Sequence, residues 1–550
     1  MQNSKVNMKW NIDAQPIFFP LEIRKTYEKI YKKNRLDFGN WIGKISVGHK
    51  QNIDWWLTKP TLRNPYNSNL LNYCSVLETL DKLKINKVQI ITSSEEMGSI
   101  IFNYFNKRFN LEVKVKNNTI SYFRRTTGIL KSLIFHTFMF LYIKVFIKKK
   151  KIELNKNYTL IDTFITPNVK LNRGFYPNLK RIIKDNTFFV PTFTHTFNFP
   201  GLINALKNSN NNFLFKEHYL SFFDYIYGYF HFFRRKKFLN KKYIYKKFNI
   251  SELVCAEIND FSNCNSTVIG ILNYRFFKKL ELSNLKIRKS INWFENQFKD
   301  RGWNLGYRKY FKRYEKNSFG YQNFTRHYNL ISFSPSVPES VAKITPNKII
   351  VISKYFKKIA KEFNKKQIVV LGPTNRFENF VSNKIKKLKR EKILLILSGI
   401  IQIDEALIRI VKKTCDINKK ITIFLKDHPI LPLDKIIKKS SLPKNLIQTN
   451  ENLETLLNKC LITIISGPTS VIKESQNMNN IILLPNIEIG TEINAKRLKL
   501  NRKYYHIVGS EIEILQTINL IKNKKLKLNK NRNKIIFFEN VTSKNIKVFL

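Results

Sequence analysis

Cysteine is scarce in this sequence, and the cysteines that occur are not paired. Five stand among 550 residues, an odd number without a C-x-x-C spacing. A disulfide framework or a cysteine-based zinc site is therefore not expected, and this usage fits a reducing cytoplasm. The five are Cys74, Cys255, Cys264, Cys415 and Cys460.

Long apolar runs are absent as well. The N-terminus, from Met1 to Trp10, is largely polar and does not resemble a signal peptide. The most apolar stretch, Leu133 to Ile143, is about half as long as a bilayer-spanning helix, and Lys131 and Lys144 bracket it. We therefore expect a cytoplasmic protein without a membrane-spanning helix.

The common nucleotide and metal motifs are also missing. The sequence has neither a G-x-x-x-x-G-K-[ST] loop nor a G-x-G-x-x-G fingerprint, which excludes P-loop and standard dinucleotide sites. No aspartate pair of the D-x-D type follows a strand, so a divalent ion held on a diphosphate is not expected. We expect neither a metal nor a resident cofactor.

Acidic side chains are outnumbered by basic ones, 39 against 98, which leaves a formal net charge of +59. Such a field attracts nucleic acid, anionic lipid and phosphorylated sugars alike. Lys, Asn, Ile and Phe are abundant together, as A/T-rich codons favour, so part of the charge reflects composition bias. The basic, aromatic stretch from Tyr229 to Lys237 has no nucleic-acid module around it, and no specific nucleic-acid partner is expected.

The sequence does contain a repeated alternation of short apolar runs and helical patterns, in two blocks. This rhythm predicts an α/β fold of parallel sheets covered by helices, and 43% hydrophobic residues suffice for sizeable cores. The first block has predicted strands at 87–91, 111–115, 158–165 and 187–190, with a helix at 97–109. The second has strands at 392–397, 420–425, 461–465 and 481–484, with helices at 404–413, 453–460 and 469–477, a mononucleotide-binding type of half.

The two blocks predict two domains. We place the boundary near residues 346–365, so that an N-terminal domain covers 1–345, with aromatic and basic helical insertions, and a C-terminal nucleotide-binding domain covers 346–520. A Lys/Asn-rich tail follows at 521–550 and becomes apolar toward its end. We expect this tail to pack back on the N-terminal domain.

Two polar motifs follow strands of the second block, where parallel sheets bind their ligands. Lys426-Asp427-His428-Pro429 follows one strand, and Pro429 keeps His428 extended beyond the strand end. Ser466-Gly467-Pro468-Thr469-Ser470 follows another strand and leads directly into a helix, where free amides and two hydroxyls favour a phosphate. We expect both motifs to surround one anion. An ordinary turn and a capped helix start are the alternatives.

These two motifs resemble the His-Pro and the later Ser-Ser/Thr motifs of bacterial GT-B glycosyltransferases that use CMP-activated acidic sugars, such as sialyltransferases and capsule-type Kdo transferases. Further segments resemble blocks found in surface-carbohydrate biosynthesis proteins. They are Trp55-Trp56-Leu57, Arg63-Asn64-Pro65, Trp293-Phe294-Glu295-Asn296-Gln297, Asp300, Gly306, Gly320-Tyr321-Gln322, Glu339 and Pro346. The resemblance implies two Rossmann-like domains with a cleft between them and a CMP-sugar held mainly by the C-terminal domain.

The resemblance also implies roles for individual residues. His428 would stabilise the leaving phosphate, Thr469 and Ser470 would bond its oxygens, and Lys426 would add positive charge. Pro429, Ser466 and Gly467 complete the two motifs, and Glu474 would lie near the nucleotide ribose or else face solvent. For the base that takes the acceptor's proton, Glu295 is the first candidate and Asp300 the second. A structural carboxylate is the alternative for Glu295, and His195 is a weaker candidate for the cleft.

Together these features predict a metal-independent transferase that moves an acidic sugar from a CMP donor to a surface glycan or glycolipid. A CDP-glycerol or other nucleotide-sugar transferase is the alternative within enzymes, and a non-catalytic assembly protein is the alternative of another class. Basic clusters beside apolar stretches, at 130–151 and 222–237, predict binding to the anionic inner face of the cytoplasmic membrane. Two core helices with solvated ends are the alternative.

Overall fold

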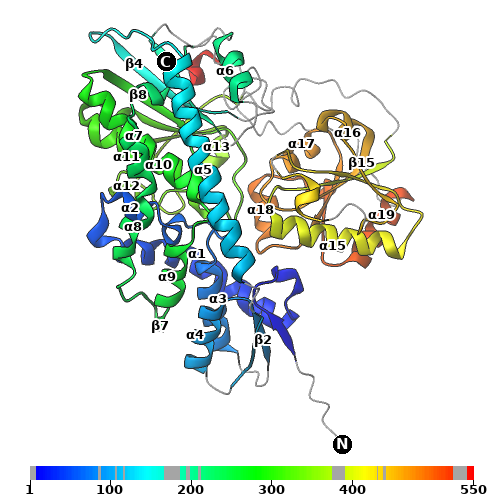
Figure 1. Ribbon diagram of the computed structural model, residues 1–550. Coiled ribbons are helices and arrows are strands. Elements are labelled where there is room, and N and C mark those ends of the chain that lie inside the picture. The colour runs from blue at the N-terminus through cyan, green and yellow to red at the C-terminus, as the bar shows by residue number, and fades with distance from the viewer. Residues whose placement is uncertain are drawn as a thin grey trace, which may run out of the picture.

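The computed structural model describes residues 8–83, 88–105, 108–114, 118–165, 186–193, 199–208, 212–374, 390–429, 431–437, 441–523 and 542–549, with only the backbone at 118–126 and 543. The described chain forms two α/β halves that lie beside each other (Figure 1). Each half is built on a parallel six-stranded sheet, so the prediction of two Rossmann-like domains is confirmed.

The sheet of the first half has the order β11-β10-β9-β8-β4-β5. Numbered along the chain from β4, this order is that of flavodoxin-like folds, in which the switch point lies between the first and third strands, here β4 and β8. Helices α10 and α11 pack on one face of this sheet, around Phe277 and Trp303. The elements are β4 (Asn157–Ile165), β5 (Thr187–Phe193), β8 (Lys286–Trp293), β9 (Ser318–Gln322), β10 (Lys348–Val351), β11 (Ile368–Leu371), α10 (Cys264–Leu282) and α11 (Phe298–Tyr310).

The strand pairing of this sheet places the domain boundary later in the sequence than predicted. Strand β10 pairs in parallel with β9, and β11 pairs with β10, so the first sheet continues to Leu371. The second sheet begins only at Lys392. The boundary predicted at residue 346 is therefore wrong, since it separates β10 and β11 from the strands with which they pair.

A smaller parallel sheet, β1-β2-β3, precedes the main one. Helices α1, α3 and α4 pack around it and bury Trp10, Ile90 and Leu77 in one core. The first two strands predicted in this region, and the helix between them, belong to this separate sheet. Its elements are β1 (Lys9–Asn11), α1 (Leu21–Ile45), α2 (Ile53–Trp56), α3 (Leu70–Lys82), β2 (Gln89–Thr92), α4 (Glu95–Phe105) and β3 (Asn110–Val113).

The second half is a sheet of order β14-β13-β12-β15-β16-β17. Counted from β12 this is the order 3-2-1-4-5-6 of dinucleotide-binding folds, whose ligand crevice opens between strands 1 and 4, here β12 and β15. The α/β fold predicted for this half is confirmed, with the strand order of dinucleotide-binding folds. Its elements are β12 (Lys392–Ile396), α15 (Ile401–Ile417), β13 (Ile423–Lys426), β14 (Leu446–Gln448), α16 (Leu453–Lys459), β15 (Cys460–Ile465), α17 (Val471–Asn477), β16 (Ile481–Pro485), α18 (Thr491–Arg497), β17 (Tyr505–Val508) and α19 (Glu511–Lys522).

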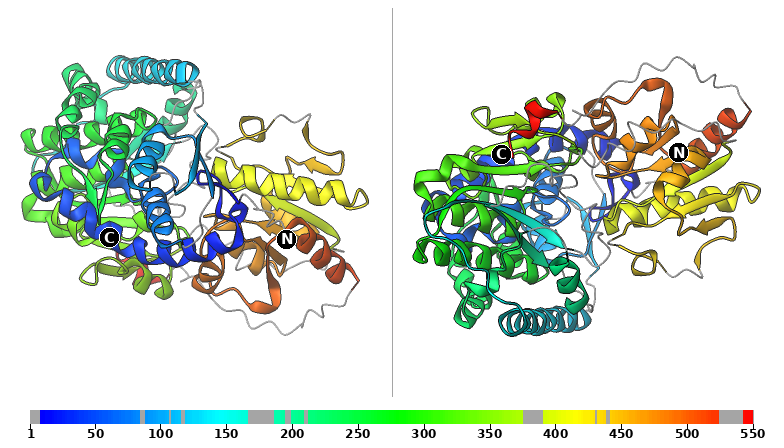
Figure 2. Two further views of the ribbon diagram at one scale, coloured as in Figure 1. Left: turned by 90° about the horizontal axis from the view of Figure 1, so that it is seen from below. Right: turned by 90° about the horizontal axis from the view of Figure 1, so that it is seen from above.

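The two halves touch through the segment that follows β16, among other contacts. Arg24 of α1 donates to the carbonyl of Asn486 at 3.0 Å. Glu362, which lies between β10 and β11 of the first half, pairs with Arg35 of the same half and with Arg497 of the second half, each at 2.9 Å. Figure 2 shows the blue N-terminal segment between the green first half and the yellow and orange second half. The small sheet and α1 thus form one wall of the junction.

The end of the chain returns to the first half. Helix α20 (Ser543–Ile546) is followed by Phe549, whose ring lies edge-on to Tyr321 of β9 with centroids 5.0 Å apart. Val548 lies near Gly372, just after β11. The red C-terminal segment in Figures 1 and 2 therefore belongs to the core of the first half.

Helix α5 (Asn118–Phe146) lies on the outside of the first half (Figures 1 and 2). It is longer than the apolar stretch that the sequence indicated, and its segment Thr127–Phe146 is long and apolar enough to cross a membrane, a criterion that core helices of soluble proteins also meet. Only 28% of that segment is buried. The inner side packs on the domain through Ile143 and His136, whose Nδ1 lies 2.8 Å from the hydroxyl of Tyr229 on α7 (Phe222–Tyr229).

Candidate functional site

The ends of three neighbouring strands in the second half converge at its switch point. Gly399 follows β12 with φ +84°, and a Cβ atom there would lie 2.6 Å from Nδ1 of His428, which follows β13. Gly467 follows β15 with φ +82°, and its Cβ atom would lie 2.9 Å from Cβ of Ser398. Only glycine adopts such angles readily at so close an approach. The half-buried imidazole of His428 therefore rests against Gly399, on one flank of β12.

We call His428, Ser398–Gly399 and Ser466–Ser470 together the strand-end cluster. The sequence placed the His-Pro and the Ser-Gly-Pro-Thr-Ser motifs at this edge but gave no role to Ser398 or Gly399, which lie between them. A Ser-Gly pair between a strand and a helix is the signal that identifies this third loop.

A carboxylate on the following helix binds the backbone amides of the loop after β12. Asp404, fully buried on α15, accepts hydrogen bonds from the amides of Ser398 at 2.7 Å and Gly399 at 2.8 Å, and from the hydroxyl of Ser398 at 2.8 Å. Burial raises the pKa of Asp404 against the effect of these donors. Because these amides are already bonded, an anion at the switch point has to use the loop after β15.

That loop carries the predicted hydroxyls. The Oγ1 atom of Thr469 accepts from the amide of Val471 at 3.2 Å, and the hydroxyl of Ser470 donates to Oε1 of Glu474 at 3.2 Å. Ser466 is buried, with its Oγ 3.5 Å from the carbonyl of Pro485. Helix α17 begins at Val471, two residues later than the sequence indicated. Glu474 is 4% exposed, so it does not face solvent.

The other residues of the His-Pro motif lie at the rim. Lys426 ends β13 and is half-buried, and its carbonyl accepts from the amide of Leu397 at 3.0 Å. Pro429 is exposed, and the carbonyl of His428 accepts from the amide of Leu431 at 3.1 Å. The motif is therefore a tight turn that keeps His428 at the carboxyl edge of the sheet.

The two candidate bases lie in the first half, at the carboxyl end of β8. Glu295 is half-buried, and it accepts from the indole of Trp293 at 2.8 Å and from the side-chain amide of Gln297 at 2.5 Å. Asp300 is fully buried and accepts from the backbone amides of Glu295 and Gln297 at 2.9 and 3.0 Å, which caps α11. Burial raises the pKa of Asp300 to about 7. Of the two, only Glu295 reaches solvent, and neither bonds a described residue of the strand-end cluster.

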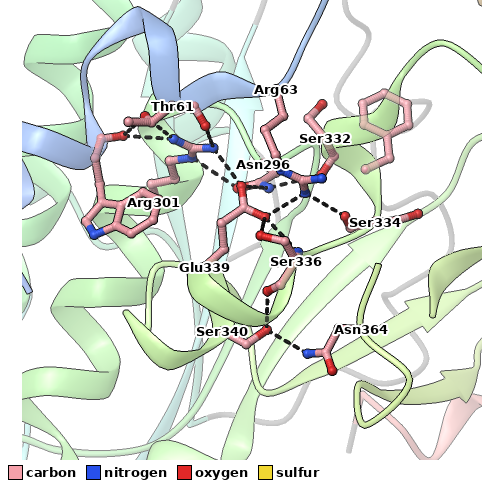
Figure 3. A network of polar contacts seen from close by, with 12 residues as sticks. Thr61, Arg63, Asn296, Arg301, Ser332, Ser334, Ser336, Glu339, Ser340 and Asn364 are labelled. Atoms are coloured by element: carbon pink, nitrogen blue, oxygen red, sulfur yellow. Dashed lines mark hydrogen bonds and ion pairs between the residues drawn. The ribbon is translucent and has the colours of Figure 1, made fainter. Parts of the chain in front are cut away.

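Four of the remaining residues of the resemblance, Trp56, Arg63, Asn296 and Glu339, meet Arg301 in a buried polar network (Figure 3). Glu339 receives Arg63 at 2.6 Å, Arg301 at 2.9 Å and the side-chain amide of Asn296 at 3.0 Å. Arg301 also donates to the carbonyl of Trp56 at 2.9 Å. All three charged side chains are 0% exposed, so this network is structural: it holds α2, α11 and α12 (Val337–Val341) together.

Two further expectations concern histidine and metal. His195 lies outside the described residues. Within the part of the chain that the structure describes, no group of three or more His, Cys, Asp or Glu side chains is placed to hold a metal ion.

Comparison with known proteins identifies no family. No family model and no curated protein matches the sequence. Solved structures with similarity include the calicheamicin glycosyltransferase CalG4, with TM-score 0.36 and 11% identity over 72% of this chain and 92% of that one. The lipopolysaccharide outer core galactosyltransferase WaaB gives TM-score 0.37 and 10% identity over 72% and 98%. MurG of Acinetobacter baumannii gives 0.35 and 9% over 68% and 92%. The function proposed below therefore rests on the residues of the site.

Proposed function

We propose that this protein is a glycosyltransferase that moves an acidic sugar from a CMP-activated donor to a surface glycan or glycolipid. The observation that carries the proposal is the strand-end cluster, which brings His428, two positive-φ glycines and two hydroxyls to the switch point of a sheet with dinucleotide-fold order. Ligands of open α/β sheets bind at this position.

The cluster suits a single phosphate as leaving group. As the bond from the sugar to the phosphate breaks, negative charge grows on the phosphate oxygens, and the imidazole of His428 donates a hydrogen bond to them. Thr469 adds a hydroxyl donor, Ser470 adds a second when its hydroxyl turns from Glu474 to the phosphate, and Lys426 adds positive charge at the rim. These groups act without a divalent metal. Glu295 is the group that we propose takes the proton from the acceptor, since it is the solvent-reaching carboxylate at the switch point of the first sheet.

Donor binding provides the direct test of this site. The double variant Thr469→Ala, Ser470→Ala is expected to bind CMP more weakly by roughly 1–3 kcal/mol, because hydrogen bonds to a charged phosphate are lost. Isothermal titration with CMP, CDP and UDP measures this and also separates a CMP donor from a CDP-glycerol donor. Thr517→Ala, on the exposed side of α19, is the matched control. Unchanged CMP affinity in the double variant would reduce the loop to a helix start, and a metal requirement for binding would contradict metal independence.

We also propose that the enzyme lies on the cytoplasmic membrane, where a lipid-linked acceptor is accessible. Helix α5 exposes an apolar stripe with helical spacing, formed by Leu130, Ile134, Phe138, Leu141 and Val145. Helix α7 packs beside it, and the ring centroids of Phe222 and Phe140 are 6.5 Å apart. Helix α7 exposes Phe223 and Ile226. We call the combined surface the α5–α7 face. An amphipathic surface of this kind lies in the plane of the headgroups, since a spanning helix would have to leave its packed inner side.

The charge beside this face favours anionic lipid. Exposed lysines at 148–151 follow α5, and exposed Lys236 and Lys237 follow α8 (His231–Arg234). Each contributes about 1 kcal/mol near an anionic surface. Replacing Lys148 to Lys151 by Gln is expected to release the protein from vesicles containing anionic lipid, as high salt would, measured by sedimentation. A matched replacement of Lys357, Lys358, Lys365 and Lys366 controls for net charge. Equal binding to neutral vesicles, or none to either kind, would contradict the proposal.

A further inference from the structure

A pocket of about 190 Å³ opens where the two halves meet. From the small sheet it is lined by Asp13, which follows β1, and Ser93, which follows β2. From the second half it is lined by Gln402 at the start of α15 and by Glu488 after β16. The carboxyl edges of two parallel sheets therefore face one cavity. Its volume is below the roughly 300–1,000 Å³ of pockets for drug-sized ligands, which indicates a single ring-sized unit.

The charge of this pocket is opposite to that of the chain. The sequence has 98 lysines and arginines, yet none is among the described residues that line the cavity, whereas Asp13 and Glu488 are. Asp13 pairs with no described cation and repels an anion, and Glu488, which has Nε2 of His327 3.4 Å away, adds no positive charge to the cavity. The pocket is therefore unsuited to the phosphate or to an acidic sugar, and it is chemically distinct from the strand-end cluster.

The polar groups are arranged to receive hydroxyls. Asp13 is exposed and accepts from the hydroxyls of Tyr73 at 3.0 Å and Ser93 at 2.9 Å. It also accepts from the backbone amide of Ser93 and, through a long bond of 3.3 Å, from the hydroxyl of Thr92. An ionised carboxylate has about four acceptor positions, so a ligand hydroxyl can take the position that the Thr92 hydroxyl holds only weakly. Glu488 is held more deeply, with the side-chain amide of Asn329 at 3.2 Å and the hydroxyl of Tyr66 bonded to it, and burial raises its pKa to about 7.

The cavity also has an aromatic wall. The rings of Phe19, Tyr27 and Tyr31 line it from the side of α1. Their centroids are 5.3 Å apart for the first pair, Phe19 and Tyr27, and 6.0 Å apart for Tyr27 and Tyr31. A sugar ring combines hydroxyls at its edge with an apolar C–H face, so it matches a site with carboxylate and amide acceptors opposite aromatic rings. Gln402 stands three residues after Gly399, and this brings the pocket next to the strand-end cluster.

We propose that this pocket binds the terminal sugar of the acceptor and that this sugar is uncharged, with Asp13 and Gln402 accepting or donating hydrogen bonds to its hydroxyls. The inference rests on the proposed function, which supplies the acceptor. It narrows that function, because an enzyme that extends an acidic homopolymer would have to place an acidic sugar here.

Matched sugar pairs test the charge preference. The probes are the methyl glycosides of glucose, galactose and mannose and of their uronic acids, which differ only in the carboxylate at C6. Saturation-transfer NMR with the full chain is expected to show binding of at least one neutral glycoside and weaker or no binding of its uronate. Asp13→Asn is expected to weaken the neutral complex about tenfold to a hundredfold, and Gln402→Ala by roughly twofold to tenfold.

The controls separate this inference from local unfolding and from the proposed function. Asp81→Asn removes an exposed carboxylate that pairs with Lys247 on the far end of α3 and should leave binding unchanged. Gln402 is exposed and bonds no described side chain, so its variant keeps the fold even where Asp13→Asn perturbs the small sheet. Preferred binding of uronates, no binding of any neutral glycoside, or neutral binding unaffected in both variants overturns the inference. CMP binding, measured separately, decides the proposed function independently of these outcomes.

Discussion

His428→Ala is expected to lower the transfer rate by at least about 100-fold, which is the cost of removing one preorganised donor to a developing oxyanion. The physical reason is the position of the imidazole at the carboxyl edge of β13, against Gly399, with the Ser398–Gly399 loop between it and the turn that carries Thr469 and Ser470. The fold is expected to persist, because His428 is only half-buried and leaves space beside Gly399 rather than a hole in the core. The measurement is the single-turnover rate of sugar transfer, with CMP affinity determined in parallel.

The second histidine of this domain supplies the control. His506 on β17 is also half-buried, but it lies at the edge of the sheet, away from the switch point. His506→Ala is expected to retain the wild-type rate. A folded His428→Ala protein with near-wild-type turnover would remove His428 from the chemistry and favour a non-catalytic role for this half.

Glu339→Gln is expected to cause the largest loss of stability, about 3–5 kcal/mol, because two buried guanidinium groups lose the carboxylate that neutralises them. Burial alone would raise the pKa of Glu339, yet Arg63 and Arg301 hold it below its ordinary value. Burial lowers the pKa of Arg301 to about 10, so at neutral pH it stays charged and would be left without its partner. In calorimetry the transition of the first half should move down by about 4–7 °C.

A surface ion pair provides the matched comparison. Glu315 pairs with Lys343 at 2.6 Å, but the two side chains are 29% and 31% exposed. Glu315→Gln is therefore expected to cost less than about 1 kcal/mol. If Glu339→Gln shifted the transition no more than Glu315→Gln does, the network in Figure 3 would not be a major source of stability.

The second half was predictable because its strands are short apolar runs, each followed by polar residues and then a helix. The sequence of the first half was less informative. Strands β10 and β11 are short, and the lysine-rich segment 354–366 between them has the composition of a linker, so the boundary was drawn before strands that pair with β9.

The candidate site was predictable only where its residues are consecutive. His428 and Ser466–Ser470 are contiguous motifs after strands, so their type and spacing indicated an anion site. Gly399 makes room for the imidazole of His428, and no local sequence pattern reveals that contact. The pocket is still harder to predict, since Asp13 and Glu488 are far apart in the chain and face one cavity only after the two halves have met.

The contact of Phe549 with Tyr321 determines the order in which the two halves can finish folding. The ribosome finishes the second half before it delivers Phe549 to the core of the first half, so the first half cannot reach its final packing until this segment has emerged. Domains that lie wholly N-terminal fold as they emerge. Among the described residues, the second half at 392–523 stands in the sequence between β11 and α20, which both belong to the first half, so it is in effect an insertion with two covalent connections to its neighbour. Loss of the last few residues would thus act on the half of the molecule that is made first.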